Sequence, residues 1–138
     1  MYEQKEFMSY YEKYFYDILK DIERDYDVIV QPQVNLASVI EKNIKHKYVI
    51  EKNIKHKYVN ELFRNIDFGI FDKNFHKLLL AIEINDSSHL KKDRIIRDLK
   101  VEKILNQANI KLIKFYTNMP NEKLYVTNRI LTYLDLLI

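Results

Sequence analysis

The N-terminal part of the chain has apolar residues at helical spacing. Between residues 3 and 25 they recur mostly at intervals of three or four, which is the spacing of one face of an amphipathic helix. They are Phe7, Tyr11, Tyr14, Phe15, Ile18 and Ile22. We therefore predict a helix whose tyrosines lie in the core. The alternative is an exposed aromatic surface for stacking, although stacking platforms usually lie on sheets or in grooves.

Four further runs predict β-strands. Residues 27–30 form a short β-rich stretch, and Pro32 after them favours a sheet edge or a loop. Residues 65–72 (NIDFGIFD) and 77–85 (KLLLAIEIN) have strand composition, and the turn-like residues 73–76 join them into a predicted hairpin. Residues 110–116 (IKLIKFY) predict another strand.

Two more helices complete the pattern. Asp86, Ser87 and Ser88 supply loop and cap chemistry before a highly charged helix over about residues 90–108. Pro120 and Asn121 precede a final helix. Its expected inward side chains are Leu124, Ile130, Leu131, Leu134 and Leu137. The order helix, three or more strands, helix, strand, helix predicts an α/β fold, a mixed β-sheet flanked by helices.

The composition favours one compact domain over residues 1–138, because 47% of the 138 residues are hydrophobic. The absence of cysteine excludes disulfides, thiolate zinc sites and cysteine nucleophiles, and the four histidines lack a zinc-binding spacing. The N-terminal sequence is too acidic for a signal peptide, and no apolar run reaches membrane-spanning length. We expect a soluble, cytoplasmic protein with no membrane partner.

Charge is distributed unevenly along the chain. The formal net charge is +3, but residues 1–30 carry eight acids against four bases, whereas residues 40–59 and 91–114 are clearly basic. This asymmetry indicates an anionic partner on one side of the molecule.

Residues 40–59 are a tandem duplication, the ten residues IEKNIKHKYV twice. A ten-residue insertion preserves strand parity but turns a following helix by about −80°, so an extended or looped second copy is easier to accommodate. The repeat interleaves tyrosines with Lys45, Lys47, Lys55 and Lys57. It therefore predicts a flap that grips nucleic-acid phosphates. The alternatives are a solvated arm, and an arm exchanged between two chains of a homodimer.

The predicted hairpin places two acids opposite each other. With a turn centred between Asn74 and Phe75, residues whose numbers sum to about 150 are neighbours, so Asp67 faces Glu83. Alternation sends one set of side chains to the core, namely Ile66, Phe68, Ile70, Leu78, Leu80, Ile82 and Ile84. The opposite face carries Asp67, Gly69, Ala81, Glu83 and Asn85.

Two acids on neighbouring strands favour a bound cation, because their Cβ atoms are roughly 5 Å apart and like charges repel. Gly69 is the only glycine and costs stability within a strand unless something approaches closely, so with Ala81 opposite we expect an open patch beside the acids. Carboxylates suit Mg²⁺ or Mn²⁺, which activates water and neutralises a scissile phosphate. The alternative is that Asp67 and Glu83 lie at a solvated edge or pair with basic side chains.

Three segments together resemble a known superfamily. NIDFGIFD, LLLAIEINDSSH and DRIIRDLKVEKILNQANIKLIKFY resemble the PD-(D/E)XK (restriction-endonuclease-like) nucleases. The resemblance is strongest to a small uncharacterised branch similar to very-short-patch-repair-type endonucleases. It covers residues 65–116, and the preceding QPQVNL also fits. It implies an αβββαβ core plus a C-terminal helix, and a nuclease that acts on DNA, with RNA not excluded.

The resemblance assigns roles to four residues of the hairpin. Asp67 corresponds to the first acid of the superfamily and Glu83 to the second, while the peptide carbonyl of Ile84 is a further metal ligand. Asn85 departs from the pattern, because the superfamily usually has a lysine there that positions and polarises the attacking water. Either a basic residue of the following helix substitutes for it, or activity has been lost.

The segment after the hairpin contains the remaining candidates. Asp93, Arg97 and Lys100 follow one helical stripe, so Arg97 or Lys100 can reach back to the acids; the alternative is a solvated ion-pair face. His89 lies where the resembling branch has a histidine that contacts phosphate, ligates metal or acts as general acid, although a lone histidine is often a loop or cap residue. Lys91 and Lys92 add candidate phosphate contacts.

Three functions compete at this point. The first is a metal-dependent nuclease that hydrolyses phosphodiester bonds by metal-activated water. The second, favoured by Asn85, is a catalytically inactive nucleic-acid-binding module of the same fold. The third is a dimeric protein-interaction element that uses the many leucines and isoleucines of the C-terminal helix.

Overall fold

The element order agrees with the sequence prediction. A computed structural model describes residues 1–41, 62, 64–75, 77–86 and 92–136. Its main elements are α1 (Tyr10–Asp25), β1 (Val28–Asn35), β2 (Asn65–Asp72), β3 (Leu78–Asn85), α3 (Lys92–Gln107), β4 (Lys111–Tyr116) and α4 (Lys123–Tyr133). A short 3₁₀ turn, η1 (Leu36–Ser38), follows β1. The fold class is therefore α/β, as predicted.

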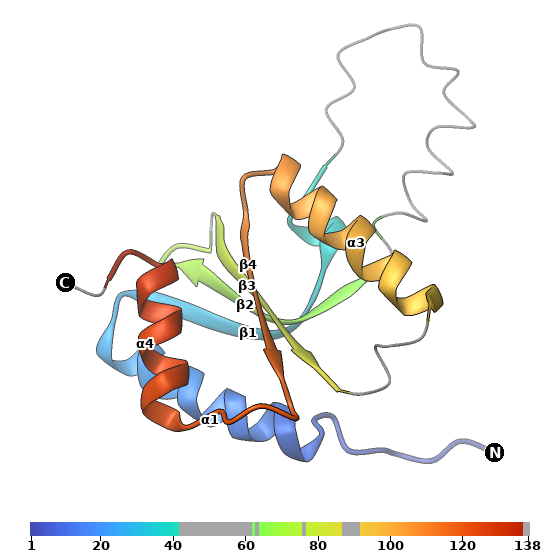
Figure 1. The fold of residues 1–138 in the computed structure, drawn as a ribbon, viewed down its shortest axis with the longest axis horizontal. Helices are drawn as coiled ribbons and strands as arrows, with labels where there is room; N and C mark the ends of the chain where they lie inside the picture. Colours follow the sequence, from blue (N-terminus) through green and yellow to red (C-terminus); the bar gives the residue numbers. More distant parts are fainter. Residues whose placement is uncertain (42–61, 63, 76, 87–91, 137–138) are drawn as a thin grey trace, which may run out of the picture.

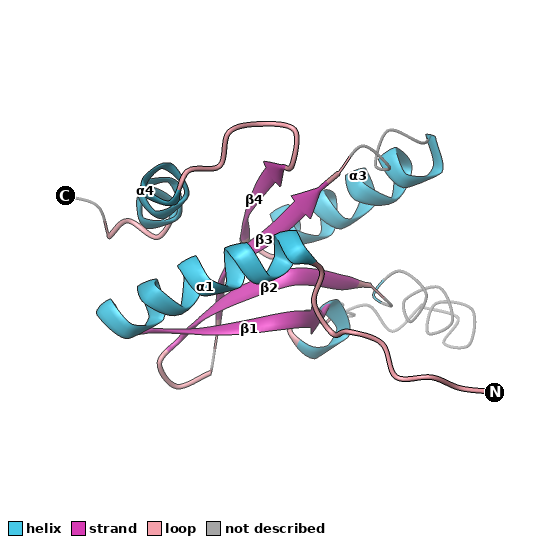
Figure 2. Cartoon of the chain, turned by 90° about the horizontal axis from the view of Figure 1, so that it is seen from below, coloured by secondary structure: helices cyan, strands magenta, loops and turns pink. Residues whose placement is uncertain are grey.

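The four strands form one mixed sheet in the order β1-β2-β3-β4. β1 pairs with β2 and β2 with β3 in antiparallel fashion, whereas β3 and β4 are parallel because α3 connects them. α1 and α4 cover one face of the sheet and α3 covers the other (Figures 1 and 2). Each face therefore has its own apolar cluster.

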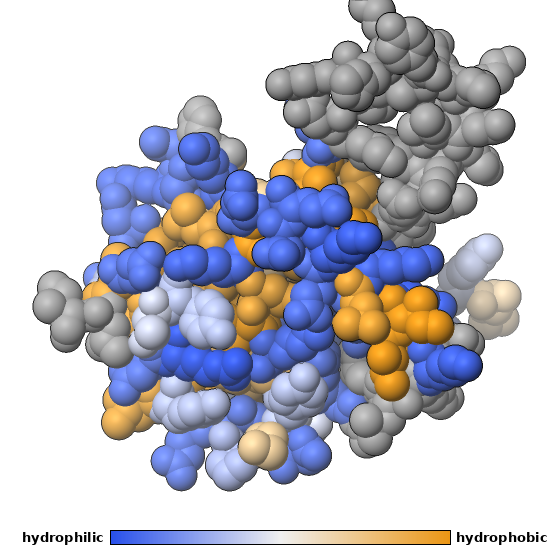
Figure 3. Space-filling model, turned by 45° about the horizontal axis from the view of Figure 1, so that its top comes forward, coloured by the Kyte–Doolittle hydropathy of each residue, from blue (hydrophilic) through white to orange (hydrophobic). Residues whose placement is uncertain are grey.

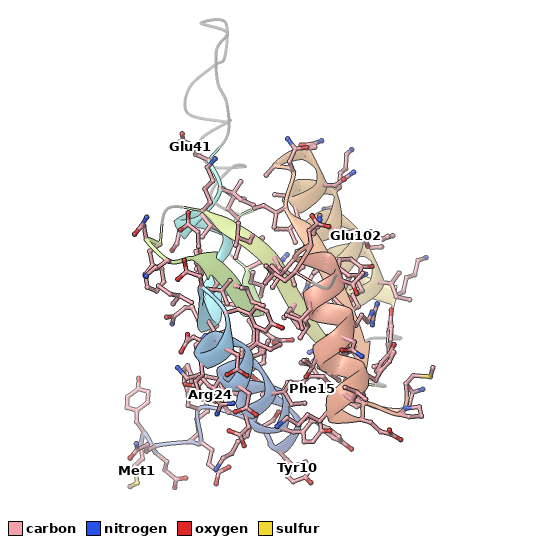
Figure 4. All side chains as sticks on the ribbon, turned by 90° about the vertical axis from the view of Figure 1, so that its left-hand side faces the viewer. Met1, Tyr10, Phe15, Arg24, Glu41 and Glu102 are labelled. Atoms are coloured by element: carbon pink, nitrogen blue, oxygen red, sulfur yellow. The ribbon has the colours of Figure 1, made fainter. Side chains whose placement is uncertain are left out.

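The first helix begins later than its apolar pattern suggests. Ser9 caps α1 by accepting a hydrogen bond from the Glu12 N–H at 3.2 Å, so the helix starts at Tyr10. Its buried face comprises Phe15, Ile18, Leu19 and Ile22. Phe15 points from α1 toward the rest of the molecule (Figure 4). The prediction of buried tyrosines was wrong for Tyr11 and Tyr14, which are exposed, as is Phe7.

The hairpin has the predicted register. Phe68 pairs with Ile82 and Ile70 with Leu80, so the residue numbers sum to 150. A bulge between Ile70 and Phe71 then pairs Phe71 with Leu78. The bulge moves Leu78 to the α3 side, against the prediction that it faces the same core as Leu80.

Two other local predictions concern the strand that contains Pro32 and the buried face of the last helix. Pro32 lies in β1, which is an edge strand and extends beyond the predicted residues 27–30 to Asn35. In α4, Ile130 and Leu131 are buried as predicted, but Leu124 is 71% exposed because Val126 occupies the inward position of the first turn. None of the described helices is long and apolar enough to cross a membrane.

Candidate functional site

A pocket of about 250 Å³ lies between the sheet and α3, beside the start of β2 and the end of β3. Both acids of the hairpin line it, together with Asp98, four basic side chains, two amides and three apolar residues. The lining residues are Arg64, Asn65, Asp67, Glu83, Ile84, Asn85, Arg94, Arg97, Asp98, Val101, Leu112 and Lys114. On the face that Figure 3 turns toward the viewer, hydrophilic side chains lie beside smaller hydrophobic patches.

Asp67 and Glu83 lie one step beyond the last backbone pair of the hairpin, Phe68 with Ile82, and the same register makes them neighbours. Here a side chain takes part in linking the strands: Asp67 Oδ2 accepts a hydrogen bond from the Ile84 N–H at 2.7 Å. The N–H and C=O of one strand residue lie on the same edge, so the Ile84 carbonyl points toward β2 as well. Asp67, Glu83 and the backbone of Ile84 are therefore close together where the pairing ends.

The environment of Glu83 opposes its ionisation. Burial raises the pKa of Glu83 to about 9, helped by charge repulsion from Asp67 and a hydrogen bond with it. Asp98 also raises this pKa, whereas Lys114 lowers it. At neutral pH the Glu83 carboxyl therefore keeps its proton and shares it with Asp67.

The donor set of this acid pair fits a hard divalent cation. A cation between the two carboxyl groups would take the place of the shared proton and remove their repulsion. Within the described residues no group of three or more His, Cys, Asp or Glu side chains is gathered for a metal. Mg²⁺ does not need one, because it is usually held by one or two carboxylates and keeps several waters. Asp67, Glu83 and the Ile84 carbonyl would suffice.

The strand glycine has a packing role, which corrects the expectation of an open patch. A Cβ at Gly69 would lie 2.8 Å from Leu78 Cδ1 and 3.0 Å from Val34 Cγ2, and its neighbour Ala81 is fully buried. The bulge that turns Leu78 to this side is the reason. The space over the cross-strand row formed by Gly69 of β2 and Ala81 of β3 is thus filled. The pocket begins only at the next row on this face, which is formed by Asp67 and Glu83.

The helix presents a different stripe to the pocket from the one predicted. Arg94, Arg97, Asp98 and Val101 line it, at the i, i+3, i+4 and i+7 positions of one helix face. Arg97 is therefore in the site, as the sequence suggested. Lys100 is exposed and does not line the pocket.

Sequence reasoning missed three of the basic lining residues, Arg64, Arg94 and Lys114. Lys114 is the register partner of Glu83 on β4. Lys114 lies beside Glu83 only because the strand order places β4 next to β3, and the residues around Lys114 do not by themselves predict that contact. Asn85 also lines the pocket and is 5% exposed.

The remaining candidate residues do not line the pocket or lie outside the described part of the chain. Lys92 lies at the exposed start of α3 and is not among the lining residues. His89, Lys91 and the repeat lysines Lys45, Lys47, Lys55 and Lys57 lie outside the described residues. Their assignments stay predictions.

Comparison with known proteins gives one match. A family model described as "Protein of unknown function (DUF2726)" matches residues 4–135. Neither the curated proteins nor the solved structures give a match.

Proposed function

The chain belongs to the DUF2726 family, and from the geometry of its pocket we propose that it is a Mg²⁺- or Mn²⁺-dependent nuclease that hydrolyses phosphodiester bonds of DNA. The observation that carries the proposal is the pairing of Asp67 with Glu83 beside a rim of basic side chains. Two facing carboxyl groups attract a divalent cation, and arginines around them attract the phosphate that such a cation acts on. The similarity to the PD-(D/E)XK superfamily supports the same assignment.

The two acids and the Ile84 carbonyl would hold the cation. When bound, such a cation lowers the pKa of water and neutralises developing charge on the phosphate. In the overall reaction the water oxygen bonds to phosphorus, the bond from phosphorus to the leaving sugar oxygen breaks, and that oxygen gains the proton that water loses. The products are a phosphomonoester and a free hydroxyl.

The residues of the chain contribute binding and orientation. Arg94 and Arg97 face the pocket from α3 and can form paired hydrogen bonds with non-bridging phosphate oxygens. The Ile84 N–H fixes one oxygen of Asp67. Val101 and Leu112 form an apolar wall that limits water on one side.

A manganese titration against linear, branched and single-stranded DNA tests the proposal. Asp67→Ala and Glu83→Ala are each expected to slow cleavage by at least about 100-fold, since even one preorganised electrostatic contact is worth that much. Asp72→Asn is the matched control, because Asp72 lies at the other end of β2, in the hairpin turn. Unchanged cleavage in both alanine variants would reject this site.

A catalytically inactive DNA-binding module is the second candidate. Asn85 favours it, because a buried asparagine stands where the resembling nucleases have a lysine. The four basic side chains of the pocket could still bind phosphates. Binding that weakens steeply with salt, without cleavage of any of the three substrates in Mg²⁺ or Mn²⁺, would favour this candidate over the nuclease.

A further inference from the structure

Three functional side chains form a row across adjacent strands. The hairpin register places Asp67 of β2 beside Glu83 of β3, and Glu83 is in turn the register partner of Lys114 of β4. Register partners direct their side chains to the same face of a sheet. The row thus runs acid, acid, lysine along the floor of the pocket.

Lys114 makes contacts through both its side chain and its backbone. Its Nζ lies 3.0 Å from Glu102 Oε2 of α3, and its peptide carbonyl accepts a hydrogen bond from Arg129 Nη1 at 2.9 Å. The Arg129 guanidinium in turn lies 4.9 Å from the ring centroid of Phe115. The backbone of Lys114 is therefore tied to α4 through Arg129, while its ammonium group forms an ion pair that can be exchanged.

The two residues of the ion pair between Lys114 and Glu102 differ in how far they are exposed to solvent. The Lys114 side chain is 24% exposed, whereas that of Glu102 is 50% exposed. Glu102 is not among the residues that line the pocket, but Lys114 is. A phosphate entering the pocket can therefore replace the outer carboxylate as the partner of Lys114 without any change of the backbone.

We infer that Lys114 supplies, from the neighbouring strand, the positive charge that Asn85 cannot supply. This inference rests on the proposed nuclease function. Lys114 is the register neighbour of Glu83, whereas Arg94 and Arg97 approach from a separate element, the helix. The ammonium group would contact the scissile phosphate and orient the attacking water beside the acid pair, exchanging Glu102 for the phosphate oxygen.

Variants on both sides of the ion pair test the inference. Lys114→Met is expected to slow single-turnover cleavage at saturating Mn²⁺ by at least about 100-fold, with Lys114→Arg retaining more activity than Lys114→Met. Glu102→Gln, which breaks the same ion pair but leaves the lysine, is expected to stay within about threefold of the unmodified chain, because an exposed pair contributes little by itself. Lys111→Met is the control on the same strand; Lys111 pairs with Asp135, away from the pocket.

Melting temperature and DNA binding by fluorescence anisotropy in Ca²⁺ complete the comparison. A merely structural ion pair predicts that Lys114→Met and Glu102→Gln lose activity and melting temperature equally. If the unmodified chain cleaves and Asp67→Ala does not, a Lys114→Met rate within about threefold of the unmodified chain overturns this inference alone. No cleavage by the unmodified chain in any metal overturns the proposed function and the inference with it.

Discussion

The two faces of the sheet are built from alternate residues of the same strands, yet they carry opposite chemistry. On the α1 and α4 side, Phe68, Leu80 and Ile82 are fully buried against helical side chains. On the α3 side, the residues next to them in sequence, Asp67 and Glu83, line an open pocket. One face thus supplies most of the apolar packing, while the other gives up packing at one end to hold charged groups.

The reason lies in how α3 covers its face. Leu105, near the C-terminal end of α3, is fully buried, and Val101 and Ile104 pack against the same cluster. The preceding turns carry Arg94 and Arg97 instead, and Ile95 and Leu99 there are 44% and 58% exposed. Because only part of the helix is apolar toward the sheet, the pocket opens where the helix begins.

Substitutions at two consecutive residues should separate the faces most clearly. Asp67→Asn is expected to reduce cleavage by at least about 100-fold, with little effect on unfolding. Phe68→Ala should cost about 3–5 kcal/mol of folding free energy, since it empties a fully buried aromatic site. Urea denaturation and single-turnover kinetics on both variants measure the contrast. Equal loss of stability in the two would contradict the assignment of the faces.

The pocket face should also make stability depend on pH. Because burial and Asp67 raise the pKa of Glu83 from 4.5 to about 9, the folded chain keeps a proton that the unfolded chain releases above pH 4.5. This contribution to stability is complete below pH 4.5, declines as the pH rises and is lost once the pH passes about 9. The total change is on the order of a few kcal/mol.

Glu83→Gln isolates this contribution of Glu83 to stability. The variant keeps the shape of the side chain but has no carboxyl group to ionise, so its stability should exceed that of the unmodified chain increasingly as the pH rises from 5 toward 9. Thermal melts across this range measure the difference. Parallel pH profiles for the two proteins would show that Glu83 is not the group responsible.

Sequence reasoning succeeded where the information was local. The hairpin register followed from the turn and from alternation, and it brought Asp67 and Glu83 together correctly. It failed where the answer depended on distant contacts. Lys114 joins the site only because β4 lies beside β3, and the glycine row is filled because a bulge turns Leu78 and the edge strand supplies Val34.

The sequence also could not predict which face of α3 turns toward the sheet. The apolar residues of this helix form only a weak periodic pattern, and charged residues occur on every side of it. Arg97→Ala is expected to weaken DNA binding by about tenfold, as it removes a pocket-lining charge. Lys100→Ala, its neighbour one turn along, should change binding by about twofold or less because its side chain lies outside the pocket. Anisotropy titrations in Ca²⁺ compare them. A larger loss for Lys100→Ala would show that the helix presents the originally expected stripe to DNA.

The smallest effect on stability is expected for a substitution at Gly69, which lies in the filled row next to the pocket. Gly69→Ala would place a methyl group 2.8 Å from Leu78 Cδ1, 3.0 Å from Val34 Cγ2 and 3.2 Å from Phe71 Cε2. Overpacking costs about 1–3 kcal/mol, whereas replacing glycine gains about 0.4–1 kcal/mol through the unfolded chain. Because Val34 is 5% exposed and its β-branched side chain has little freedom to move, the cost should prevail by about 1 kcal/mol. A lower urea midpoint with an unchanged denaturant slope is the expected result. A stabilised variant would mean that this row is open and that the pocket extends further under α3 toward Ala81.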